Sequence, residues 1–208
     1  MFTSITEIEI AEQVPKSSLP WVWVGFLFAG AFFVIQVLFL ILGWDLQAIT
    51  AILILISLSG TIYWLFCVHR IHKVLRELTH SRYPVSPNEA AFKHLIPFYN
   101  LFWIFSWPTE LSTYLNRQGR VSMISGNVIG AMLLLALLIT RFIDGAVGMT
   151  FEFAVTMYMA AKVKSHVKLL GGVTPDQLPP LPDPRIFSRP IESVSAPVPE
   201  VVKEPSAG

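Results

Sequence analysis

Charged residues are scarce in this chain, and that shortage excludes several classes of protein at once. Asp, Glu, Lys and Arg make up 14% of its 208 residues, whereas soluble domains carry about 25%. So few charges cannot cover an ordinary globular surface, and the mean hydropathy of +0.59 agrees. The net charge of +1 provides no overall attraction to nucleic acid. We therefore expect neither a typical soluble domain nor a nucleic-acid-binding protein.

Cysteine and catalytic motifs are also missing. Because Cys67 is the single cysteine, no internal disulfide can form, and pairing gives no information about the redox compartment. The sequence contains no phosphate-binding loop, dinucleotide fingerprint, nucleophile elbow or zinc motif. Residues 1–20 lack the basic stretch that opens a secretory signal, so we expect a retained polar tail. We predict no enzyme activity and no cofactor.

What the chain has instead is long uncharged apolar runs. Residues 21–44 and 48–68 contain no charged side chain, and about 20 apolar residues in a helix cross the ~30 Å hydrocarbon core of a bilayer. The short connection between them makes the two helices antiparallel neighbours. Weaker runs cover 121–140 and 145–163, the latter with Glu152 in it. The pattern predicts an all-α polytopic membrane protein with four transmembrane helices in two hairpins.

Three further segments complete the predicted organisation. Within the aromatic segment 91–107, only the 13 residues 95–107 lie between the Lys93–His94 pair and Pro108, too few to cross a bilayer. We therefore expect a cytoplasmic-side interfacial or re-entrant segment. A short amphipathic helix is expected over 109–118. The whole membrane domain is expected to cover residues 21–170. Residues 171–208 hold nine of the fifteen prolines, a composition typical of a disordered tail.

The basic residues predict the orientation. With four spans and both termini in the cytoplasm, 14 of the 15 Lys and Arg residues lie inside and only Arg141 lies outside, as the positive-inside rule requires. If 91–107 were a fifth span, 7 would lie inside and 8 outside. That split is no bias, so an even number of crossings is expected.

One stretch resembles a known family. The run PNEAAFKHLIPFYNLFWIF, followed by ELSTYLNRQG, is similar to a motif in uncharacterised bacterial multi-pass membrane proteins of the domain-of-unknown-function type. In them an IPFxNL element follows a helical hairpin and precedes a short helix. The resemblance covers roughly residues 84–120 and implies a multi-pass protein of the bacterial cytoplasmic (inner) membrane. It implies no catalytic residue, because the family has no assigned chemistry.

The favoured function at this stage is non-enzymatic. A basic and aromatic cytoplasmic surface is suited to anionic lipid headgroups or to a partner protein, which indicates an accessory, scaffold or assembly protein. The expected partners are the lipid bilayer and either a membrane protein or further copies of the chain, and not nucleic acid. The residues of this predicted surface are Arg70, Lys73, Arg76, Trp103, Trp107 and Arg117.

The alternative is a small oligomeric channel or transporter with a proline-kinked re-entrant segment. Polar and ionisable residues in membrane segments are candidates for a pathway, and here they are Asn100, Arg141, Asp144 and Glu152. However, Arg141 and Asp144 lie near the end of a span, where they can reach water and neutralise each other. The first two spans offer only Gln36 and scattered Ser and Thr, which favours the accessory function.

A third hypothesis is a membrane enzyme that uses His69, His72 and His94, and it requires a bound metal. His69 and His72 are three residues apart, a spacing that suits a metal site only weakly, and no carboxylate or cysteine cluster completes one. We expect them to be interfacial residues beside lipid headgroups. Gly126 and Gly130 allow two helices to approach closely, and packing within the bundle is the favoured explanation.

Overall fold

The computed structural model describes residues 17–43, 45–79, 83–119 and 121–170, and this part of the chain contains helices and no strand. The all-α prediction is therefore confirmed for these residues. The rest of the expected tails, residues 1–16 and 171–208, lies outside the described part. In chain order the elements are α2 (Val24–Leu42), α3 (Leu46–Leu78), α4 (Pro87–Phe92), the 3-10 turn η1 (Lys93–Leu95), α5 (Tyr99–Arg117), α6 (Gly126–Phe142) and α7 (Gly145–Leu170).

Two of the described helices, α2 and α3, are long and apolar enough to cross a membrane. They form the predicted hairpin, in which the Asp45 carboxylate accepts a hydrogen bond from the Gln47 amide at the start of α3 (3.5 Å). Helix α6 is also apolar but has only 17 residues. Helix α7 has 26 residues, but Glu152 and its lysines lower its hydropathy. Length and composition thus support two of the four predicted spans.

Helix α3 continues far beyond the predicted second span. Its 33 residues correspond to about 50 Å at 1.5 Å per residue, which exceeds the ~30 Å thickness of the hydrocarbon core. The amphipathic continuation expected after residue 68 is therefore present as part of the same helix. It ends at Leu78, just before the turn that precedes Pro84 and Pro87.

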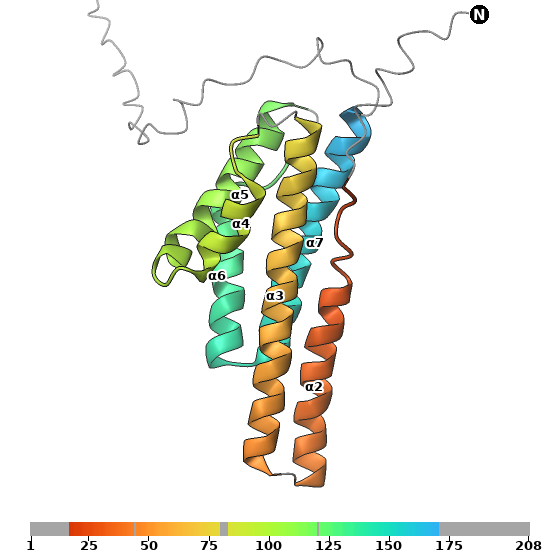
Figure 1. Cartoon of the computed structure of the whole chain (residues 1–208), viewed down its shortest axis with the longest axis vertical. Coiled ribbons are helices and arrows are strands. Elements are labelled where there is room, and N and C mark those ends of the chain that lie inside the picture. Colours follow the sequence, from red (N-terminus) through yellow and green to blue (C-terminus); the bar gives the residue numbers. More distant parts are fainter. Residues whose placement is uncertain (1–16, 44, 80–82, 120, 171–208) are drawn as a thin grey trace, which may run out of the picture.

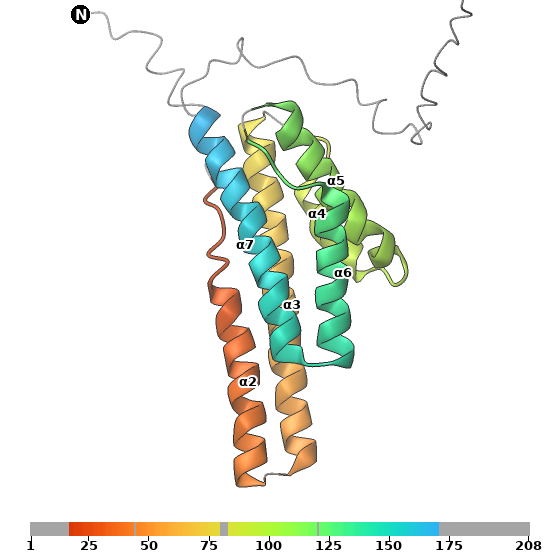
Figure 2. The same cartoon turned by 180° about the vertical axis from the view of Figure 1, so that it is seen from behind.

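The connection between α6 and α7 does not reach as far as the α2–α3 turn (Figures 1 and 2). The side-chain amide of Gln36 donates a hydrogen bond to the Asp144 carboxylate (3.1 Å), so this connection lies beside the middle of α2. From Gln36 to the end of α2 there are six residues, or about 9 Å of helix. The α2–α3 turn therefore projects beyond the rest of the bundle.

The aromatic segment is organised differently from the prediction. We expected an interfacial segment over 91–107 followed by a separate helix over 109–118, but α5 runs without a break from Tyr99 to Arg117. Pro108 removes one amide donor from this helix. The Thr109 hydroxyl donates to the Phe105 carbonyl (2.7 Å), and the buried Pro108 ring is held between α5 and its neighbours. The carbonyl that loses its donor at Pro108 is that of Ile104 and not that of Phe105, so tertiary packing carries the helix through the proline.

Gly126 and Gly130 let α6 lie directly against α5. A Cβ on Gly126 would overlap the backbone of Thr109, and one on Gly130 would overlap the backbone at Phe105. Both glycines therefore serve packing within the chain, as expected from their spacing.

The helices are joined by one hydrophobic core near the C-terminal ends of α3, α5 and α7. We call its centre the upper core, and it consists of Val68, Ile71, Trp107, Leu111 and Leu115, all of them fully buried. Close by, the backbone amide and the hydroxyl of Ser17 both donate to the Glu77 carboxylate (2.8 Å each). This clamp fixes the chain before α2 against the end of α3.

Candidate functional site

A partly enclosed cavity of about 230 Å³ lies where α3, η1, α5, α6 and α7 meet. Its apolar walls include Trp64, Ile104 and Met149. Its polar residues come from all five elements, and we call the space they line the polar cavity: Ser57, Thr61, His94, Asn100, Thr140, Arg141 and Glu152.

His94 and Asn100 form one end of the polar cavity. The Nδ1 atom of His94 is 2.6 Å from the Asn100 Oδ1 atom, and the imidazole packs edge-on against Trp64. Burial lowers the pKa of His94 from its ordinary 6.5 to about 4, although the hydrogen bond to Asn100 opposes the shift. The ring is therefore neutral at pH 7, with Nδ1 donating to Asn100. Its Nε2 atom is buried and keeps a lone pair to accept a further hydrogen bond.

A strained turn places Asn100 opposite His94. Phe98 has a φ of 62° and a ψ of −40°, a conformation that bulky residues rarely adopt. The Tyr99 amide donates to the Pro97 carbonyl (2.7 Å), which closes a γ-turn, and the Asn100 amide donates to Ile96 (3.1 Å). The sequence indicates a kink at Pro97, whereas the strain itself lies at Phe98. Strain of this kind persists where surrounding structure fixes it, often at functional sites.

Arg141 and Glu152 supply the two formal charges of the polar cavity. Arg141 lies in the last turn of α6 and also lines an adjoining groove of about 420 Å³ between α2 and α3. Glu152 is half-buried on α7. Within the described part of the chain, no ion pair joins these two side chains.

Hydroxyl groups line the wall between these charges. The Thr61 hydroxyl donates to the Ser57 carbonyl (2.9 Å), and the Thr140 hydroxyl donates to the Ala136 carbonyl (2.8 Å). Both donors are thus used within their own helices, while the oxygen atoms remain available as acceptors. Sequence analysis missed these residues. The available signal was the spacing of Thr50, Ser57 and Thr61, which puts three hydroxyls on one face of an apolar helix.

Asp144, the fourth predicted pathway residue, has a different role. Its carboxylate accepts the hydrogen bond from Gln36 and a second one from the Val147 amide (2.8 Å), so it caps the start of α7. The structure therefore brings Asn100, Arg141 and Glu152 together around one cavity and leaves Asp144 outside its lining.

The two charges lie between the ends of the apolar section of the bundle. At one end, Trp21 and Trp23 are 71% and 54% exposed and stack on each other, and the Tyr63 hydroxyl donates to the Trp21 carbonyl (2.8 Å). Exposed tryptophans prefer the membrane–water interface. At the other end is the α2–α3 turn. Arg141 and Glu152 both lie between these ends, and Glu152 directly precedes Phe153, whose ring packs against Tyr63 (centroids 6.2 Å apart).

The predicted partner surface divides into two groups. Arg76 and Arg117 are exposed, and Arg70 and Lys73 are partly exposed, so these four remain at the surface. The tryptophans do not: Trp103 is 4% exposed and Trp107 is fully buried. The Trp103 indole donates to the Ala90 carbonyl (3.2 Å), and Trp107 packs edge-on against His72. Burial removes both rings from any surface that binds lipid or protein, because they form the core that holds α5 in place.

The two weak metal candidates lie in different surroundings. His72 is fully buried among aromatic rings, whereas His69 is partly exposed and lies 3.2 Å from the Asn88 side-chain oxygen. No group of three or more His, Cys, Asp or Glu side chains that could hold a metal occurs among the described residues.

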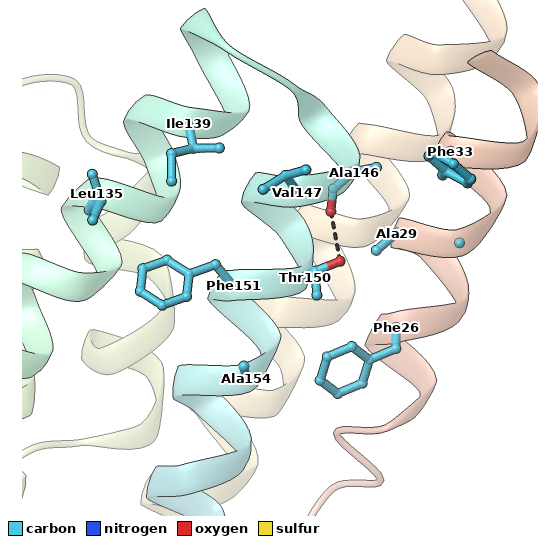
Figure 3. Close-up of a pocket in the computed structure, with 11 residues that line it drawn as sticks. Phe26, Ala29, Phe33, Leu135, Ile139, Ala146, Val147, Thr150, Phe151 and Ala154 are labelled. Carbon is cyan, nitrogen blue, oxygen red and sulfur yellow. Dashed lines mark hydrogen bonds between the residues drawn. The ribbon is translucent and has the colours of Figure 1, made fainter. Parts of the chain in front are cut away.

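A second hollow, of about 700 Å³, is an open apolar groove between α2, α6 and α7 (Figure 3). Phe26, Phe33 and Phe151 form its sides. The Thr150 hydroxyl, its polar side chain, donates to the Ala146 carbonyl (2.8 Å). This groove offers a hydrocarbon surface and little for a polar ligand to bind.

Comparison of the chain with protein-family models, curated proteins and solved structures finds no match. The resemblance of residues 84–120 to bacterial multi-pass proteins therefore remains an expectation based on the motif.

Proposed function

We propose that this chain is a multi-pass protein of the bacterial cytoplasmic membrane that binds a small polar solute in the polar cavity and conducts or transports it. One observation carries the proposal: Arg141 and Glu152, on different helices, line a single cavity together with Asn100. Charged side chains are costly at membrane depth and are kept there mainly for function. This geometry supports the channel or transporter function over the accessory function that the sequence favoured.

The proposed topology has α2 and α3 as full spans and α6 with α7 as a second hairpin that enters from the same side. Phe142 and Ile143 in the α6–α7 connection are 81% and 78% exposed, which suits hydrocarbon rather than water. Whether this hairpin crosses completely or turns back below the far surface, its ends return to the same side. Together with the 14-to-1 distribution of basic residues, this supports both termini in the cytoplasm.

In this topology η1 and the strained turn at Phe98 lie at the interface. His94, in η1, contacts Trp64, and the neighbouring Tyr63 hydroxyl donates a hydrogen bond to the carbonyl of the exposed Trp21. The turn thus lies at the level of the tryptophan pair. Phe98, which is 89% exposed, then faces the headgroup region or the first part of the hydrocarbon layer.

The size of the polar cavity limits the solute. Liquid water occupies ~30 Å³ per molecule, so 230 Å³ corresponds to about eight water molecules. Drug-sized ligands need about 300 Å³ or more. A solute of a few non-hydrogen atoms is therefore the expected ligand class, and the groove beside Arg141 offers it a route to the cavity.

A second candidate function remains the accessory or scaffold role at the cytoplasmic face. The exposed Arg76 and Arg117, with the partly exposed Arg70 and Lys73, favour it, because basic side chains near a membrane surface attract anionic headgroups. This surface is separate from the polar cavity, so the two functions can be tested independently.

The test is a flux assay with the full chain in liposomes, using a panel of K⁺, Cl⁻, acetate, methylammonium and glycine. We expect at least one solute to move, and the substitutions Asn100→Ala and Glu152→Gln to abolish its flux. Glu89→Gln is the matched control, because Glu89 caps α4 outside the cavity and glutamine preserves that capping pattern. If correctly folded protein moves none of these solutes, the transport proposal is overturned and the accessory function is favoured.

A further inference from the structure

The polar cavity carries two opposite charges that do not pair with each other. Arg141 is exposed and Glu152 is half-buried. A guanidinium remains charged at every physiological pH, and where these side chains face hydrocarbon instead of water an unpaired charge is costly. In the described part of the chain, no hydrogen bond or ion pair engages the side chain of Arg141 or the carboxylate of Glu152. A ligand that satisfies both residues must therefore contribute two charges of its own.

The two charges are separated along the bundle. Arg141 ends α6 just before the connection, whereas Glu152 is seven residues after the start of α7, a rise of about 10 Å. Between their levels the lining carries the Ser57, Thr61 and Thr140 hydroxyls. The space therefore suits an elongated ligand whose opposite charges are at its two ends and whose middle is short.

The other end of the cavity adds polarity without charge. His94 is neutral, because burial lowers its pKa to about 4, and Asn100 is a neutral amide. With the Glu152 carboxylate ionised, the lining holds one positive and one negative group, and a cationic group bound beside Glu152 favours that ionised form. A lone anion would satisfy Arg141 and leave Glu152 unpaired, and a lone cation would do the reverse.

We propose that the ligand of the polar cavity is a small zwitterion, with its anionic group at Arg141 and its cationic group at Glu152. This inference rests on the proposed function, because it names the class of solute that the same cavity binds. It goes beyond that function in assigning a separate recognition role to each charged residue.

The test uses three probes of similar size: 4-aminobutyrate, which carries both charges, and butyrate and butylammonium, which carry one each. Dissociation constants are measured by calorimetry on the full chain in lipid nanodiscs. The wild type is expected to bind 4-aminobutyrate at least about tenfold more tightly than either single-charge probe, because hydrogen bonds to charged groups contribute ~1.5–3 kcal/mol each.

Variants then assign each end of the probe. Glu152→Gln should abolish the advantage of 4-aminobutyrate over butyrate, and Arg141→Gln should abolish its advantage over butylammonium. Arg141→Lys retains the charge and should retain the preference at lower affinity, which covers the case that Arg141→Gln fails to fold. The controls Arg76→Gln and Glu89→Gln make the same charge changes outside the cavity and should leave all three constants unchanged.

The inference is overturned if butyrate or butylammonium binds as tightly as 4-aminobutyrate, or if the cavity variants leave the preference intact. Failure of the inference differs from failure of the proposed function. If an inorganic ion crosses the liposome membrane in a Glu152-dependent manner while no zwitterion binds, the function stands and the ligand class is wrong. If no solute moves and no probe binds, both are wrong.

Discussion

The two ends of the bundle differ in how far their apolar side chains are buried. In the projecting α2–α3 turn, Leu40, Ile41 and Leu46 are 79%, 71% and 64% exposed, so the apolar side chains point away from the protein. In the upper core, Trp107 and Leu111 are completely buried. Lipid can solvate apolar side chains and water cannot. This contrast is what the proposed topology predicts: apolar side chains at one end face lipid, and those at the other end pack into a core.

The first and largest expected effect comes from opening the upper core. Trp107→Ala removes a fully buried indole that packs against His72 and His94, and such truncations cost about 3–5 kcal/mol. Trp23→Ala, at a 54% exposed position, should cost under ~1 kcal/mol. Denaturant titration of the detergent-solubilised chain measures both free energies of unfolding. Equal losses for the two tryptophans would contradict the proposed contrast between the ends.

A second comparison uses two glycines. Gly126→Val places side-chain atoms where the Thr109 backbone lies, and overpacking of this kind costs ~1–3 kcal/mol. Gly30→Val faces the open apolar groove, where nothing lies within 4 Å of an added Cβ, so no loss is expected. The same titration distinguishes them. Similar stability of the two variants would show that α5 and α6 are not in close contact.

The third prediction concerns the pH dependence of stability that His94, at one end of the polar cavity, produces. Because the folded pKa of His94, about 4, is below its ordinary 6.5, the unfolded chain binds the proton more tightly. The free energy of unfolding that the neutral His94 contributes is therefore complete above pH 6.5. It is lost as the pH falls towards 4, and the free energy changes by at most ~1.4 kcal/mol per pH unit. His94→Gln should reduce the loss. Unfolding titrations at pH 7 and pH 5 provide the measurement, and identical pH dependence in both proteins would refute it.

The smallest expected effect lies in the half of the bundle that includes the α2–α3 turn. Gln36→Leu removes the hydrogen bond from α2 to Asp144, and such contacts between membrane helices average ~0.6 kcal/mol. The exposed carboxylate still caps α7, so the fold should persist. A double-mutant cycle with Asp144→Asn isolates the coupling free energy. A coupling above ~2 kcal/mol would mean that this end is held as tightly as the upper core.

The sequence predicts the parts of the fold that depend on long uncharged runs. The α2–α3 hairpin follows from residues 21–44 and 48–68. The course of α5 was not predictable in this way, because proline favours a break unless neighbouring groups compensate. The group that compensates is the closely packed α6, whose Gly126 and Gly130 lie against the α5 backbone, and only the tertiary fold brings it there.

The candidate site was predictable only in part. Charge within an apolar run identified Arg141 and Glu152, and the fold places both at one cavity. The aromatic composition of their segment predicted that Trp103 and Trp107 lie at the surface, although both are buried. Aromatic residues suit a membrane interface and a protein core equally well, so composition cannot distinguish the two. Asp144 lies outside the cavity lining because its carboxylate is engaged by the Val147 amide, a local helix cap, and by Gln36, which is distant in sequence.

Helix α3 links the basic end of the molecule to the polar cavity as one continuous helix. It runs for 33 residues without a proline, with Arg70, Lys73 and Arg76 near one end, and Ser57 and Thr61 at the polar cavity. A rod of this kind cannot tilt at its basic end without displacing the wall of the cavity. In the proposed topology, docking at the basic end of α3 would therefore move the wall of the polar cavity directly.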